Sequence, residues 1–120
     1  GLKWSPFDLA RGKRQAAATA DERAALLDGR AAADQVRLEV ALAYRRAVSA
    51  RERHAAASGG SEEGREAFRV VQERRKAGLA TLTDELETET AALGAALQEI
   101  GAASEVAIAD AALKRAAGEI

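Results

Sequence analysis

The chain has 120 residues, of which 48 % are hydrophobic, 31 % are charged and only 3 % are aromatic. This length permits one domain at most, and the abundance of alanine, glutamate, leucine and arginine is typical of long helices and coiled coils. A net charge of −1 with both signs interspersed provides no electrostatic case for binding nucleic acid, and the lack of cysteine excludes disulfides and thiolate metal sites.

The first eight residues, GLKWSPFD, differ in composition from the rest of the chain. Pro6 favours extended geometry for Ser5, and Asp8 is a suitable N-cap for a following helix. We therefore expect a short extended segment that ends near Asp8. Two roles are equally open for Trp4 and Phe7: contact with a membrane interface, or packing against the start of the helix.

A long helix is predicted over residues 11–77. Small or apolar residues recur in it at alternating steps of three and four, which is the pattern of a heptad seam. At about 1.5 Å per residue, this helix would be about 100 Å long. Its predicted seam consists of Ala33, Val36, Val40, Ala43, Ala47, Ala50, His54, Ala57, Ser61, Gly64, Phe68 and Val71.

The sequence SGGS at residues 58–61 interrupts this pattern. Each glycine in a helix interior costs about 1 kcal/mol relative to alanine. Because the seam keeps its phase across these residues, we favour a continuous helix over a loop. His54 lies on the same seam, so we interpret it as a half-buried packing residue rather than a metal ligand.

A tight turn at residues 78–83 is predicted to lead into a return helix over residues 84–117. The cations at residues 74–76 suit the negative end of a helix dipole, and Gly78 suits the left-handed conformation that ends a helix. Thr81 and Asp84 have the spacing of a capping box, and Gly118 follows the expected end of the return helix. The predicted seam of this helix is Leu86, Leu93, Leu97, Ile100, Ser104, Ala107 and Ala111.

Folding about this turn predicts a lopsided antiparallel hairpin, an all-α fold in which Ala117 lies opposite Tyr44. Residues 11 to about 43 would then have no partner within the chain. Because exposed apolar surface usually finds a partner, we expect self-association through a stripe on the long helix. The members of this stripe are Val36, Val40, Ala43 and Ala47.

The alternative fold is a compact bundle of three or four helices. It requires breaks near Ala57 and at Asp28 and Gly29, where Ser-Gly-Gly and Asp-Gly sequences both permit turns.

Four motifs together resemble one structural repeat of the TolC-like outer membrane factors. WSPFDLAR is similar to the end of the family's barrel strand, and LEVALAYRRAVSARE is similar to its long helix. RRKAGLATLTDELETE resembles the family's periplasmic turn, R-x-x-x-G-x-x-[ST]-x-x-D-x-L-x-A, and AALKRAAGE resembles the close of its returning helix. The chain departs from the family at Leu9 and Ala10, which replace two glycines, and at the SGGS sequence.

The resemblance implies a trimeric, non-enzymatic efflux or secretion duct without a cofactor. Residues 1–9 would be the remnant of an outer-membrane β-strand with its strand-to-helix turn, and residues 10–120 a periplasmic hairpin within an α-barrel. The implied partners are further copies of the chain, a periplasmic adaptor protein and, indirectly, an inner-membrane pump. The implied location is the periplasmic portion of an outer membrane protein.

The resemblance also assigns candidate sites at the turn. The implied adaptor contacts are Gly78, Leu79 and Thr81. The implied gate and inter-subunit residues are Arg75, Thr83, Asp84 and Glu87. Asp84 and Glu87 are three residues apart and project from one helix face, so in a symmetric assembly each would form a ring of carboxylates that attracts cations.

From the residues alone, the acids after the turn are first of all capping and helix-dipole groups. A gate-lining role is the second interpretation. Catalysis is disfavoured, because no nucleophile, tunable base or shaped pocket accompanies these acids.

The alternative function is a helical-hairpin interaction module, such as a periplasmic adaptor hairpin or an engineered coiled coil. Adaptor hairpins carry an R-x-x-x-L-x-x-x-x-x-x-S sequence near the tip. Arg75 and Leu79 match its first half, whereas Leu86 occupies the position of the serine.

Overall fold

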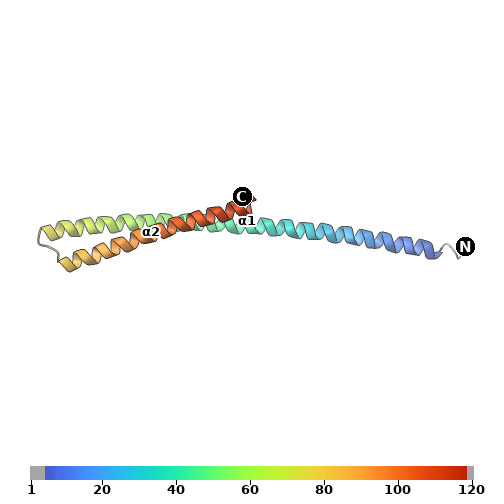
Figure 1. The fold of residues 1–120 in the computed structure, drawn as a ribbon, viewed down its shortest axis with the longest axis horizontal. Coiled ribbons are helices and arrows are strands. Elements are labelled where there is room, and N and C mark those ends of the chain that lie inside the picture. The colour runs from blue at the N-terminus through green and yellow to red at the C-terminus, as the bar shows by residue number, and fades with distance from the viewer. Residues whose placement is uncertain (1–4, 119–120) are drawn as a thin grey trace. The chain divides into compact units, whose positions relative to one another are not determined.

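The computed structural model describes residues 5–118 and consists of two helices joined by a turn (Figure 1). Helix α1 comprises Ser5–Lys76 and helix α2 comprises Leu82–Ala116, and residues 5–118 contain no strand. Two units divide the chain between Glu39 and Val40, so α1 contributes to both. The all-α helical hairpin is confirmed. The compact bundle is wrong, because α1 has no break near Ala57 or at Asp28 and Gly29.

The start of α1 differs from the expected one. Residues 5–8 are helical, whereas the sequence favours an extended segment there. The reason is that Pro6 lies in the first turn, where its missing N–H leaves no hydrogen bond unmade and its fixed φ is already helical. Residues 1–4, and with them the expectation for Trp4, lie outside the described residues.

In the first unit, the side chains of residues 13–39 are all exposed. They include the large apolar residues Leu26, Leu27, Val36 and Leu38. This part of α1 therefore offers apolar side chains that are not covered within its own unit.

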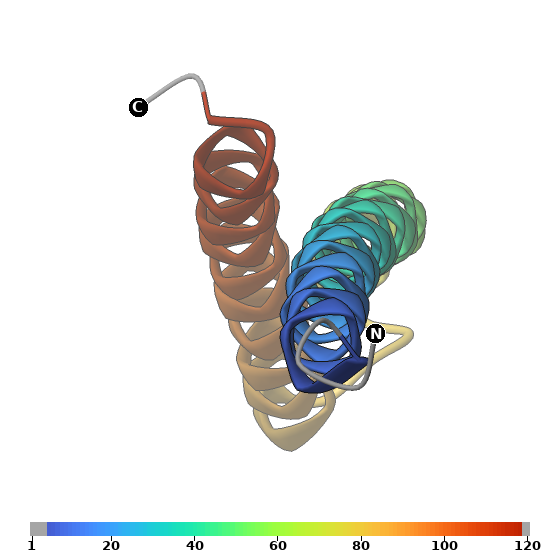
Figure 2. The ribbon, with the colours of Figure 1, turned by 90° about the vertical axis from the view of Figure 1, so that its right-hand side faces the viewer.

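In the second unit, α2 runs antiparallel beside the later part of α1 (Figure 1). Figure 2 shows α1 and α2 as two separate helices, viewed along their lengths. Ion pairs join the helices at Arg51 and Asp110, over 3.1 Å, and at Arg53 and Glu105, over 3.2 Å. Arg51 and Asp110 lie opposite each other in the same antiparallel register that was predicted to place Ala117 opposite Tyr44.

The α1 seam is confirmed from Val40 to Val71, since every predicted member in that range is buried or half-buried. Ala43, Ala47, Ala50 and Ser61 are buried. The self-association stripe must be corrected accordingly. Ala43 and Ala47 belong to the packed hairpin, so they are not free to bind a second chain.

The predicted seam of α2 is wrong. Leu93, Leu97 and Ile100 are 60 %, 68 % and 64 % exposed, and small residues occupy the packed face instead. At Gly64, an added Cβ would lie only 3.1 Å from the Cα of Ala92, so the two backbones approach too closely for a leucine between them. The less exposed face of α2 carries Ala92, Ala95, Ala102, Val106 and Ala109.

Candidate functional site at the interhelical turn

The end of α1 is a Schellman motif. Gly78 has a φ of 75°, and its N–H donates to the Arg75 carbonyl over 3.0 Å. The N–H of Leu79 donates to the Arg74 carbonyl over 2.8 Å. These two bonds satisfy carbonyls that the helix end leaves free, and the positive φ favours glycine at this position. The predicted left-handed role of Gly78 is confirmed, and Gly118 has a φ of 78° after α2.

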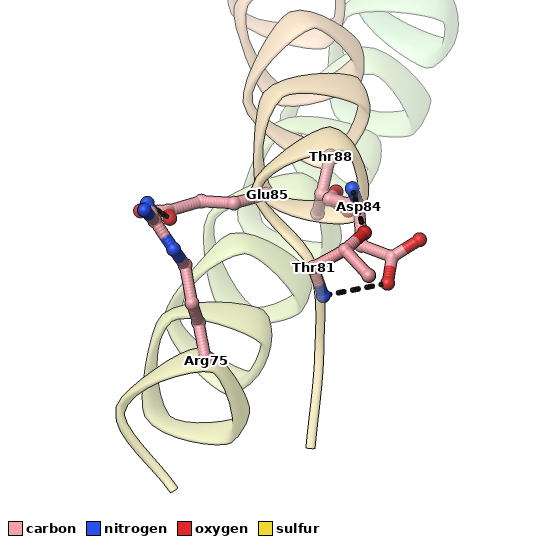
Figure 3. A network of polar contacts seen from close by, with 5 residues as sticks. All are labelled: Arg75, Thr81, Asp84, Glu85 and Thr88. Atoms are coloured by element: carbon pink, nitrogen blue, oxygen red, sulfur yellow. Dashed lines mark hydrogen bonds and ion pairs between the residues drawn. The ribbon is translucent and has the colours of Figure 1, made fainter. Parts of the chain in front are cut away.

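The start of α2 is a capping box, as predicted from the spacing of Thr81 and Asp84 (Figure 3). The Asp84 N–H donates to Thr81 Oγ1 over 3.1 Å, and the Thr81 N–H donates to Asp84 Oδ2 over 3.0 Å. The α2 helix consequently begins at Leu82 rather than at Asp84. The hydrogen bond from the Thr81 backbone, and secondly the one with the Thr81 side chain, hold the pKa of Asp84 below its ordinary value.

Arg75 and Glu85 form an ion pair across the turn (Figure 3). The resemblance implies that Arg75 is an inter-subunit residue, and within this chain its guanidinium binds Glu85, which is not among the implied site residues. The sequence feature that indicates this ion pair is the basic last turn of α1 followed closely by the acidic first turn of α2. Both helix dipoles favour this arrangement of charges.

The remaining predicted site residues lie around this rigid turn. Leu79 is 78 % exposed, and Thr83 and Glu87 are exposed in the first two turns of α2. The turn therefore presents an apolar side chain at its apex and polar groups beside it. Chemically, such an arrangement can dock a protein surface or line a charged constriction.

A second polar cluster lies within the helix pair, far from the turn. Ser58 Oγ donates to Glu99 Oε1 over 3.3 Å, and the neighbouring Ser61 is buried. The Ser61 hydroxyl foremost, and also the Ser58 hydroxyl and the charges of Arg65 and His54, hold the pKa of Glu99 below its ordinary value. His54 is half-buried, as predicted. The spacing of SGGS did not reveal its partner Glu99, because that contact joins two helices.

Among the described side chains of residues 13–118, no group of three or more histidine or acidic residues is arranged to hold a metal ion. Neither α1 nor α2, over the same residues, contains a stretch apolar enough for a membrane-spanning helix.

The sequence profile of the outer membrane efflux protein family matches residues 2–119, nearly the whole chain. The chain belongs to the outer membrane efflux protein family. No curated protein and no solved structure matches it. The family is one of transport channels that are associated with the outer membrane, and it is not a family of enzymes. The assignment favours the channel over the adaptor hairpin.

One prediction concerns the capping box. Thr81→Ala should lower the free energy of unfolding by about 1 kcal/mol, the typical cost of losing an N-cap side chain.

A second prediction concerns the pH dependence of the same capping box. Because the folded-state pKa of Asp84 is lowered, the contribution of Asp84 to stability is complete above the unfolded pKa of about 3.9 and is lost as the pH falls through the folded-state pKa. The melting temperature of the wild type should thus fall more steeply below about pH 4 than that of Asp84→Asn.

The measurement is thermal unfolding followed by circular dichroism from neutral to acidic pH. Glu87→Gln serves as the matched control, since Glu87 lies one turn later and is not part of the capping box. If Asp84→Asn and the wild type lose stability equally in acid, Asp84 does not act through the cap.

Proposed function

We propose that this chain forms one hairpin repeat of an outer membrane efflux channel, with its helices in the wall of a periplasmic α-barrel built by a trimer. The observation that carries the proposal is the exposed heptad seam of α2. Leu86, Leu93, Leu97 and Ile100 recur with coiled-coil spacing, yet the face toward α1 uses alanine. Helix α2 thus has an alanine face that packs against α1 and an exposed leucine and isoleucine seam that can pack against a neighbouring helix. In a closed ring of helices, each helix needs two such contact faces.

The proposed adaptor contact is the turn, with Gly78, Leu79 and Thr81. Its support is the shape of the apex, where a Schellman motif and a capping box hold an exposed leucine in place. An apolar side chain on a rigid turn loses little conformational entropy on docking. An inner-membrane pump would be reached only through the adaptor.

The proposed gate consists of Arg75, Thr83, Asp84 and Glu87. Asp84 and Glu87 project from one face near the start of α2, so symmetric copies would surround the channel axis with carboxylates. Arg75 is held by Glu85 in the isolated chain. A link from Arg75 to a neighbouring copy would therefore require Arg75 to release Glu85 and bind the Thr83 hydroxyl or the Asp84 carboxylate of that copy.

Single-channel recording in planar bilayers tests this function, with the full-length protein that contains the hairpin. Asp84→Asn with Glu87→Gln should weaken cation selectivity and block by trivalent cations, because each neutralised position removes one ring of charge. Arg75→Ala should raise the resting conductance. Glu89→Gln is the control, since Glu89 is an exposed acid outside the proposed gate. Unchanged selectivity and block in the double variant would reject the gate and leave Asp84 as a helix-capping residue and Glu87 as an exposed surface acid.

A further inference from the structure

The glycines within the helices of the second unit gather at one level of the hairpin. The contact of Ser58 with Glu99 and the approach of Gly64 to Ala92 and Ala95 show that residues 58–64 of α1 lie beside the corresponding part of α2. The glycines at this level are Gly59, Gly60, Gly64, Gly94 and Gly101.

Packing explains just one of these five. A Cβ at Gly64 would meet the Ala92 backbone, but a Cβ at Gly59, Gly60, Gly94 or Gly101 would meet nothing within 4 Å. None of the five has a positive φ. Because a glycine lowers the equilibrium for helix formation about fivefold relative to alanine, four replaceable glycines at one level weaken both helices in the same place.

The seam between the helices is also polar at this level. Ser61 is 0 % exposed, and its Oγ lies close enough to the Glu99 carboxylate to lower the pKa of Glu99 but makes no hydrogen bond of ordinary geometry within the described residues. Glu99, half-buried in α2, binds the neighbouring Ser58. Elsewhere the buried seam residues are alanines: Ala43, Ala47 and Ala50 on α1, and Ala102 on α2. An incompletely paired hydroxyl in a closed interface favours opening, since water satisfies it.

We propose that residues 58–64 and 94–101 form a flexure, where the hairpin opens or bends while the segments on either side remain packed. Glu99 holds the flexure closed through Ser58. The alanine seam and the Arg51–Asp110 pair fix one side, and the capped turn with its Arg75–Glu85 pair fixes the other. The flexure is a property of the hairpin alone, so its test does not depend on channel assembly.

Hydrogen exchange of the 120-residue chain, read by mass spectrometry, tests the proposal. Amides of residues 58–64 and 94–101 should exchange at least about tenfold faster than those of residues 43–50 and 102–109, because local opening is more frequent where helix propensity is low. Equal protection along the packed part of the hairpin would overturn the flexure.

Variants then separate the effect of the glycines from the effect of the hydrogen bond between Ser58 and Glu99. Gly59→Ala with Gly60→Ala should slow exchange at residues 58–64 by up to about 25-fold, since two glycines each contribute about fivefold. Gly29→Ala, an equally open site in the first unit, is the control and should leave that rate unchanged. If residues 58–64 exchange at the same rate in the double alanine variant as in the wild type, the proposal is overturned.

Glu99→Ala should accelerate exchange at residues 58–61 by about tenfold to a hundredfold, the factor expected for one lost hydrogen bond to a charged group. Glu105→Ala is its control, because Glu105 pairs with Arg53 on the exposed side of the hairpin. If the two variants change exchange at residues 58–61 equally, Glu99 does not hold the flexure.

Discussion

Replacing Gly64 by leucine is expected to lower the free energy of unfolding by about 1–3 kcal/mol, the usual cost of overpacking a close interface. An added Cβ lies 3.1 Å from the Ala92 Cα, and the Cβ atoms of Ala92 and Ala95 lie at 3.5 and 3.6 Å. The nearest obstacle is a backbone atom, which cannot rotate away as a side chain can. The two helices must therefore separate to admit the leucine, and neighbouring alanine contacts are lost with it.

Gly59→Leu is the matched control, with the same substitution on the same helix. No atom lies within 4 Å of its Cβ position, and leucine has a higher helix propensity than glycine, so the variant should be stabilised by up to about 1 kcal/mol. Urea unfolding followed by the helical circular dichroism signal measures both. Equal midpoints for the two variants would show that Gly64 is not a point of close approach.

Replacing Leu93 and Leu97 by serine should weaken self-association of the chain by about 100-fold or more. Both side chains are largely exposed in the hairpin, so their burial is available to a second helix. Burial of one leucine contributes about 1.5–3 kcal/mol, and about 1.4 kcal/mol corresponds to a factor of ten in affinity. Sedimentation equilibrium at micromolar concentrations gives the association constants.

Leu79→Ser is the control for this prediction. Leu79 is exposed to a similar degree but lies at the turn, away from the α2 seam, and its replacement should leave association unchanged. Circular dichroism of all variants should be alike, because none of these side chains is packed within the hairpin. A wild-type chain that stays monomeric while fully helical would contradict a second seam on α2.

Much of this molecule is determined locally, and the sequence predicts those parts well. The Gly78 helix end and the capping box of Thr81 and Asp84 depend on residues within a few positions of each other. The α1 seam was also predictable, because small and apolar residues there offer one continuous stripe across the SGGS sequence. The start of α1 was missed because proline favours both an extended predecessor and a first helical turn.

The tertiary structure alone decides which stripe of α2 meets α1. Periodicity identifies the leucine and isoleucine seam and is equally compatible with the alanine face, but it does not say which face is intramolecular. The close approach at Gly64 decides this, because backbones so near each other accept Ala92 and Ala95 and exclude leucine. The same holds for the Arg75–Glu85 pair and for Glu99 beside Ser58. Each joins residues whose proximity arises only when two helices pack in one register.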